Sequence, residues 1–203
     1  RLRALLGPAL VGDLPRSLVR LDAAAVGVRT ALRLEEALAD AGVDVTDARD
    51  AVTVVVRHGA VAARDAIGLL AEDRAHLPVA IDAGGSTVGP LVVPGSTPCL
   101  SCRDGPDRAR DPAWAALHVQ LLERDPGRVP LRAVAAAADA AADLLAVRAE
   151  SERDGSGRRI RIRRDGTRSS QTAEFHADCL CRSPRGSARD AALRDPRHAT
   201  RSA

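Results

Sequence analysis

Four cysteines in two short pairs constrain this chain more than any other feature of its sequence. Cys99 and Cys102 form a CxxC motif directly after Pro98, and Cys179 and Cys181 form a CxC motif far along the chain. Each pair places two thiols close enough to bind one ion, and four thiolates make the closed tetrahedral set of a structural Zn²⁺ site. Such a site would join two distant segments and contribute directly to folding, because the unfolded chain has no preformed site.

Other interpretations of the cysteines stay open at this point. A redox CxxC normally lies at a helix N-terminus, which lowers its thiol pKa, and it needs no second pair. Disulfides require an oxidising compartment, for which nothing in the sequence argues. Unrelated buried cysteines would not all occur in chelating pairs. His176 lies three residues before Cys179 and can replace a thiolate, although an exposed or supporting histidine fits the same position.

The middle of the chain predicts an α/β fold. Ala51–Val56 is a short, almost wholly apolar run rich in valine, which is typical of a strand buried on both faces of a parallel sheet. Residues 61–75 are predicted as a helix, Leu77–Asp82 as a second strand and Thr87–Val93 as a third. This strand–helix–strand order is the crossover unit of α/β proteins.

Three amphipathic helices are predicted around these strands. The first begins at Val26 and ends at Gly42, a plausible C-cap. The second begins at Asp111-Pro112, with Asp as N-cap and Pro at the first helical position, and the third follows Pro130. Their apolar residues recur at helical spacing: Ala31, Leu34, Leu38 and Ala41; Trp114, Leu117 and Leu121; and Leu131, Val134, Ala138, Ala141 and Leu145.

A β-hairpin is predicted near the end of the chain. Arg159–Arg164 alternates isoleucines with arginines, as a half-buried strand does. Asp165-Gly166 is a strong two-residue hairpin signal, and Gln171–Phe175 forms the returning strand.

We therefore divide the chain into three parts. Residues 1–25 form an irregular N-terminal segment, since they contain several Gly and Pro and show weak periodicity. Residues 26–182 form the α/β domain. Residues 183–203, rich in Ser, Arg, Gly and Pro, form a basic disordered tail. The chain contains no Met, so we expect it to be a fragment or a processed product.

Composition excludes several functions. No stretch reaches the roughly 18 uncharged apolar residues that span a bilayer, and no secretory leader opens the chain, so a cytoplasmic protein without membrane contact is expected. The chain has no Lys, which excludes a Schiff-base lysine and a Walker-A lysine. The net charge is +3, and the basic excess lies after residue 150. With Trp114 and Phe175 as the only aromatics, nucleic acid is not an expected partner.

No catalytic residue is predicted. Four histidines have no serine or cysteine partner at a recognisable spacing, and packing explains them as well: His58, His76, His118 and His198. Four acidic residues are assigned to loops and caps, where solvation or capping explains them: Asp82, Asp104, Asp107 and Asp111.

Several runs in the chain resemble a known family. They are His76-Leu77-Pro78, Val88–Gly95, Thr97–Cys102, Asp111–Trp114 and His176–Cys181. Together they resemble the E1-like (ThiF/MoeB/HesA) superfamily, and within it the ThiF-like proteins that act in the biosynthesis of thiazole- and oxazole-modified peptides. The resemblance implies the C-terminal part of a Rossmann-related E1-like fold, with a structural zinc held by both cysteine pairs.

The chain departs from that family at the nucleotide site. E1-like enzymes bind ATP through a GxGxxG loop after their first strand, and Leu6–Gly12 does not match it. Leu21-Asp22, Val26-Gly27 and Arg29 look like the segment that lies beyond this loop in the family. We therefore expect the first strand to lie upstream of Arg1 or to be lost, and we expect this chain neither to bind ATP nor to contain cofactor-binding residues.

The resemblance implies a function and leaves an alternative. The leading prediction is a noncatalytic, zinc-stabilised scaffold that partners a YcaO-type cyclodehydratase and its precursor peptide, in the biosynthesis of azoline-containing, bacteriocin-like peptides. The winged-helix module that captures the leader peptide in this group is not found in the chain. The alternative is a fragment of an ATP-dependent adenylyltransferase that activates a carboxylate. The alanine-rich helix 131–149 can pair with a second copy or pack within one subunit.

Overall fold

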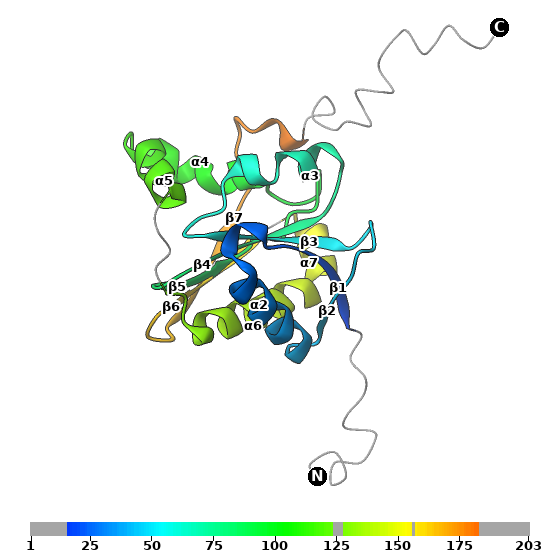
Figure 1. Cartoon of the computed structure of the whole chain (residues 1–203). Helices are drawn as coiled ribbons and strands as arrows, with labels where there is room; N and C mark the ends of the chain where they lie inside the picture. The colour runs from blue at the N-terminus through cyan, green and yellow to red at the C-terminus, as the bar shows by residue number, and fades with distance from the viewer. Residues whose placement is uncertain (1–15, 124–127, 156, 183–203) are drawn as a thin grey trace, which may run out of the picture.

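A seven-stranded sheet lies between two layers of helices (Figure 1). The computed structural model describes residues 16–123, 128–155 and 157–182. The predicted tail over 183–203 lies outside these residues, as does most of the segment 1–25. The strands are β1 (Ser17–Asp22), β2 (Val43–Val45), β3 (Val52–His58), β4 (His76–Asp82), β5 (Gly85–Val88), β6 (Gly157–Arg163) and β7 (Arg168–Ala173).

The sheet is parallel in one half and antiparallel in the other. Its strand order is β2-β1-β3-β4-β5-β6-β7. β2, β1, β3 and β4 run parallel to one another, whereas β5, β6 and β7 each pair antiparallel with the strand before them. The valine-rich β3 lies inside the parallel half, buried on both faces, as its continuous apolar sequence predicts. The predicted α/β class with a C-terminal hairpin is therefore observed.

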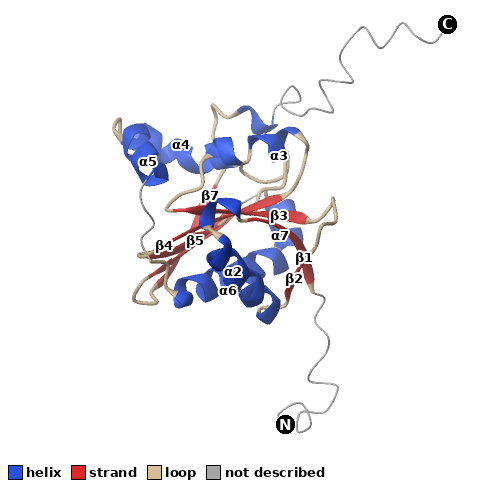
Figure 2. Cartoon of the chain, in the orientation of Figure 1, coloured by secondary structure: helices blue, strands red, loops and turns tan. Residues whose placement is uncertain are grey.

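Helices cover both faces of this sheet (Figure 2). α2 and α6 lie on one side, here called the α6 face, and α3, α4 and α5 lie on the other, here called the α4 face. The bounds are α2 (Val28–Asp40), α3 (Ile67–Ala71), α4 (Leu100–Arg110), α5 (Trp114–Glu123), α6 (Leu131–Ala146) and α7 (Arg148–Asp154). The described residues also include three short 3₁₀ turns: η1 (Ala24–Val26), η2 (Ala63–Asp65) and η3 (Leu180–Arg182).

The two long predicted helices form where expected. α2 starts two residues after Val26, and Gly42 follows its C-cap with a φ of 84°, a conformation that glycine adopts without steric cost. α6 begins directly after Pro130. Its buried alanines pack within the chain, against α2 and the sheet, which is one of the two uses that the sequence left open.

The irregular segment predicted over residues 1–25 is wrong for Ser17–Asp22, which form β1. This strand pairs with β2 on one side and β3 on the other. The strand has no clear alternation of apolar and polar residues. Leu18 is apolar but exposed beside the buried Val19, and Arg20 and Asp22 interrupt the apolar pattern. Pairing with β3 holds it in place, and that contact is not visible in local sequence.

Three other boundaries differ from the predictions. The helix expected over residues 61–75 is reduced to η2 and the five residues of α3. The strand expected over Thr87–Val93 ends at Val88, since Pro90 lacks the N–H that a ladder needs. The hairpin turn holds three residues, 164–166, because the Arg163 N–H pairs with the Thr167 carbonyl, where two had been expected.

Candidate metal centre

The first cysteine pair lies at the start of a helix on the α4 face. Cys99 is the N-cap of α4 and Cys102 lies in its first turn, so both side chains point from the same end of the helix. Both are buried. The sequence did not predict this helix, because Gly105 and Pro106 in its middle are residues that normally interrupt one.

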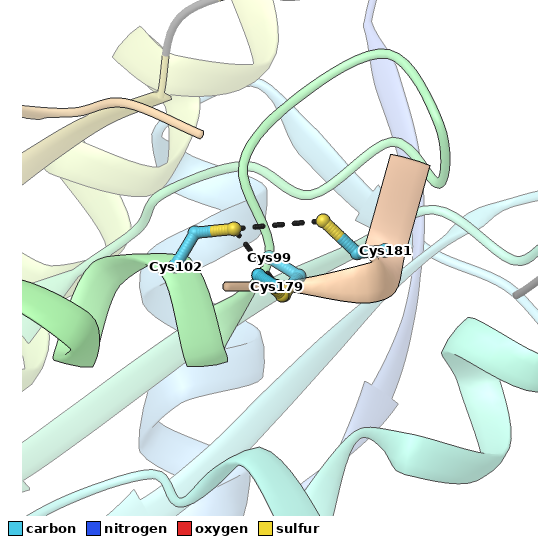
Figure 3. Close-up of side chains that lie close together, drawn as sticks. All are labelled: Cys99, Cys102, Cys179 and Cys181. Atoms are coloured by element: carbon cyan, nitrogen blue, oxygen red, sulfur yellow. Dashed lines mark hydrogen bonds between the residues drawn. The ribbon is translucent and has the colours of Figure 1, made fainter. Parts of the chain in front are cut away.

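The second pair reaches the first across the end of the hairpin. After β7 the chain turns back to α4, and the Cys179 N–H donates to the His176 carbonyl at 3.0 Å. Cys181 lies in η3. Figure 3 shows the four side chains converging from these two segments.

The sulfur positions match the geometry of a tetrahedral thiolate site. Cys99 Sγ lies 3.8 Å from Cys102 Sγ and 3.5 Å from Cys179 Sγ, and Cys102 Sγ lies 3.5 Å from Cys181 Sγ. All four sulfurs lie within 4.8 Å of one another. A tetrahedron with metal–sulfur bonds of about 2.3 Å has edges of about 3.8 Å. The cysteines are free rather than disulfide-bonded, so the cluster can hold a metal ion.

Two of these thiols, Cys99 and Cys181, favour the protonated form in the absence of a metal. A hydrogen bond with the Cys102 thiol, together with burial, raises the pKa of Cys99. Burial raises the pKa of Cys181 to about 11. A bound cation would reverse this preference by displacing the protons, and the positive end of α4 favours the resulting thiolates.

His176 is not one of the gathered ligands. Among the described residues, the metal-sized group consists of the four cysteines. The His176 ring instead lies against Gly105 of α4, where an added Cβ would come within 2.3 Å of it, and its Nδ1 accepts the Asp178 N–H at 3.3 Å. This histidine therefore packs the second cysteine segment onto α4.

The location of the CxxC changes one argument made from sequence. A helix N-terminus was taken as typical of redox pairs, and Cys99 and Cys102 lie at one. The position no longer argues against redox chemistry. The contacts between the sulfurs argue against a redox pair, because each sulfur of the first pair lies 3.5 Å from a sulfur of the second.

A buried ion pair lies directly beside the cysteines. Arg103 donates to Asp104 through Nε to Oδ1 at 2.6 Å and through Nη2 to Oδ2 at 3.0 Å, and also to the Val61 carbonyl at 2.8 Å. The prediction that Asp104 is a solvated or capping residue is wrong, since it is buried. For Asp82 and Asp111 it is confirmed, because they accept the N–H groups of Gly84 and Ala113.

The histidines that the sequence left without a role are structural where described. His76 is buried in β4, its Nδ1 lies 3.0 Å from the Arg74 carbonyl, and burial lowers its pKa. His58 Nδ1 lies 3.3 Å from the Ile81 carbonyl. The His118 ring stacks on Trp114. His198 lies outside the described residues.

The end of the parallel strands holds a salt-bridge network. The chain leaves β1 toward β2 and leaves β3 toward β4, on opposite sides of this point in the strand order. Such a switch point is where α/β sheets bind ligands. Arg57 of β3 bonds Asp22 at the end of β1 at 3.0 Å and lies 3.4 Å from Asp65. After β1 come Ala23, the three residues of η1 and then Gly27.

Within the described residues, no helix combines the length and apolarity that crossing a bilayer requires.

Comparisons with known proteins reveal similarity in fold. No known protein family matches the chain by sequence, and no curated protein does. A heterocyclase solved with substrate and cofactor is 20% identical, with a TM-score of 0.58 over 81% of this chain and 25% of its own. The heterocyclase TruD is 18% identical, with a TM-score of 0.57 over 88% of this chain and 29% of its own.

A third similar structure is E. coli MccB with AMPCPP and MccA, at 13% identity and a TM-score of 0.48 over 84% of this chain and 67% of its own. The chain thus shares the fold of part of the two heterocyclases and spans about a quarter of their length.

Proposed function

We propose that this chain is a noncatalytic, zinc-stabilised E1-like scaffold that partners a YcaO-type cyclodehydratase in the biosynthesis of azoline-containing peptides. The observation that carries the proposal is the likeness in fold to two heterocyclases over most of this chain. The family resemblance of the runs around Cys99 and Cys179 points to the same kind of pathway. The proposed domain comprises β1 together with residues 26–182 and works in the cytoplasm.

Zinc is the proposed ion because of the donor set. Four sulfurs and no oxygen or nitrogen ligand favour zinc over magnesium or calcium, and a closed set of four leaves no position for substrate. The role of the ion is then to fix the segment after β7 against α4. A surface built from both segments exists only when the ion is bound.

The salt bridges at the end of the parallel strands support a scaffold without ATP chemistry of its own. Asp22, Arg57 and Asp65 satisfy one another where a Rossmann-related fold would place a nucleotide. In the proposed system the cyclodehydratase uses the ATP, and this chain positions the enzyme and its precursor peptide.

The decisive test combines this chain with a cyclodehydratase encoded beside its gene and that enzyme's precursor peptide. We expect a stable complex by gel filtration and faster azoline formation, followed by mass spectrometry as the loss of one water per ring. Cys102→Ser should weaken both effects, whereas Ser101→Ala, a change at its half-buried neighbour that removes no thiol, should not. If the purified chain neither binds the enzyme nor alters its rate, the scaffold proposal fails.

Native mass spectrometry separates the scaffold from the alternative adenylyltransferase. One zinc per chain and no nucleotide adduct in ATP–Mg²⁺ is the expected result. A specific nucleotide adduct would replace the scaffold proposal with carboxylate adenylation.

A further inference from the structure

A small cavity lies at the N-terminal end of α6, away from the cysteines. Its volume is about 70 Å³, and its lining includes Ser86 of β5, the start of α6 and the turn between β6 and β7. It opens beside a hollow of about 530 Å³ lined by the same turn and by Arg132. Figure 1 shows the hairpin turn next to the first residues of α6.

Ser86 brings an unsatisfied hydroxyl to this cavity. Its side chain is 5% exposed, and its Oγ has no hydrogen-bond partner among the residues that the structure describes. A buried polar atom without a partner costs about 1–3 kcal/mol, so such atoms are uncommon in folded proteins. Because the cavity is lined by this residue, a ligand within it can supply the missing partner.

The helix end offers further donors. α6 has 16 residues, and its N-cap is Pro130, whose side chain makes no cap hydrogen bond. The N–H groups of Ala133 and Val134 bond to the Pro130 carbonyl, which leaves those of Leu131 and Arg132 at the open end. Aligned peptide dipoles place partial positive charge at this end, which favours an anion.

Arginines surround the mouth of the cavity. Four of them line the cavity or the hollow beside it: Arg132, Arg161, Arg163 and Arg164. Within the described residues none of the four forms an ion pair. The one acid in the lining is Asp165, whose carboxylate accepts the Thr167 N–H at 2.9 Å. The mouth therefore carries a clear excess of positive charge.

We propose that this cavity binds a phosphate group at the N-terminus of α6. The backbone N–H of Arg132, its guanidinium and the Ser86 hydroxyl supply more donors than the two oxygens of a carboxylate use, and they suit the several oxygens of a phosphate. The group comes as inorganic phosphate or as the phosphate of an ester whose remainder occupies the outer hollow. The inference does not rest on the proposed scaffold function.

The test titrates inorganic phosphate into the full chain by calorimetry at constant ionic strength. We expect saturable binding at one site. Ser86→Ala should raise the Kd about tenfold, the loss of one hydrogen bond to a charged group. It should not lower thermal stability, since the hydroxyl it removes has no partner in the free chain. Arg132→Ala should raise the Kd at least as much.

Arg29→Ala is the matched control, because it removes an equal charge from the exposed surface of α2. Its Kd should equal that of the unchanged chain. Titration with AMP distinguishes the two sources: tighter binding than inorganic phosphate indicates an ester, and equal or weaker binding indicates the free ion. Absence of saturable binding for both, or equal losses in Ser86→Ala and Arg29→Ala, would overturn the proposal.

Discussion

The two faces of the sheet are held by different forces. On the α6 face, alternate valines of β3 pack with Leu34 and Leu38 of α2 and Leu144 of α6 in one large apolar cluster. On the α4 face, the apolar cluster is small: Val55, Val61, Ala66, Ala80 and Leu100. The rest of that face is fastened by four thiols and by the Arg103–Asp104 pair.

This difference follows from helix length. α2 and α6 are long enough to present a continuous apolar stripe, so burial alone fixes them. α3 has five residues and α4 contains Pro106, and neither can bury much area. On the α4 face, a buried ion pair and a cysteine cluster that could hold a metal ion stand where apolar burial is small, so the two faces should respond differently to the same perturbation.

Metal removal should give the largest effect, on the α4 face. Chelation, or Cys102→Ser, would remove the proposed zinc, and binding of such an ion contributes on the order of 10 kcal/mol in small zinc domains. We expect fast amide exchange in α4 and in residues 176–182, with protection retained in α6. Hydrogen-exchange mass spectrometry with metal analysis measures both, and Ser101→Ala serves as the control. Equal loss of amide protection on both faces would contradict the idea that the two faces are held by different forces.

Asp104→Ala should have the next largest effect. It leaves the buried Arg103 guanidinium without its carboxylate, which typically costs about 3–5 kcal/mol. Urea denaturation measures the loss. Asp107→Ala is the matched change on the same helix, and its exposed contact with Arg110 at 3.7 Å predicts less than about 1 kcal/mol. Similar losses of unfolding free energy in both variants would show that the buried ion pair stabilises the chain no more than the exposed one.

Leu34→Ala tests the α6 face. Leu34 is 1% exposed in α2, so truncation should cost about 2–5 kcal/mol through lost burial and a cavity. Leu32 lies two residues earlier and is 55% exposed, and Leu32→Ala should change stability by less than about 0.5 kcal/mol. Metal content should stay unchanged in both. Loss of metal in folded Leu34→Ala would mean that the faces are coupled.

The same contrast explains which features the sequence could predict. The valines of β3 and the stripes of α2 and α6 are periodic, and burial follows periodicity. The cysteine cluster could be predicted because chelation depends on residue type and local spacing, as Cys99 and Cys102 illustrate. No such signal existed for β1, which depends on its neighbours in the sheet.

The remaining site features arise only from tertiary structure. α4 was missed because Gly105 and Pro106 are unfavourable in a helix, yet Gly105 is the position where the His176 ring needs space. Ser86 and Arg132 are far apart in sequence, and they meet only because α6 packs across the end of β5. No local pattern could have joined them.

The smallest predicted effect is a pH dependence confined to the α4 face. The chain has neither Lys nor Tyr, so in the unfolded chain cysteine is the one side-chain type that ionises between about pH 8 and 11. Burial raises the pKa of Cys181 to about 11 in the folded chain, whereas an unfolded thiol ionises near pH 8.5. Between these values the unfolded state loses protons first, so the stability of the metal-free chain should fall as pH rises.

The metal-bound chain should show the opposite trend. A metal needs thiolates, so its affinity increases as protons become easier to remove, and alkaline pH should strengthen the bound form. Urea midpoints of both forms, measured under reducing conditions from about pH 7.5 to 10.5, test the pair of slopes. Cys181→Ser should reduce the metal-free slope, because it removes one of the two thiols whose pKa is raised, and the Cys99 thiol keeps the remainder. The cluster on the α6 face contains only apolar side chains, so amide protection in α6 should follow the global stability of the chain. If the metal-free chain instead becomes more stable as pH rises, the buried thiols are not the cause of its pH dependence.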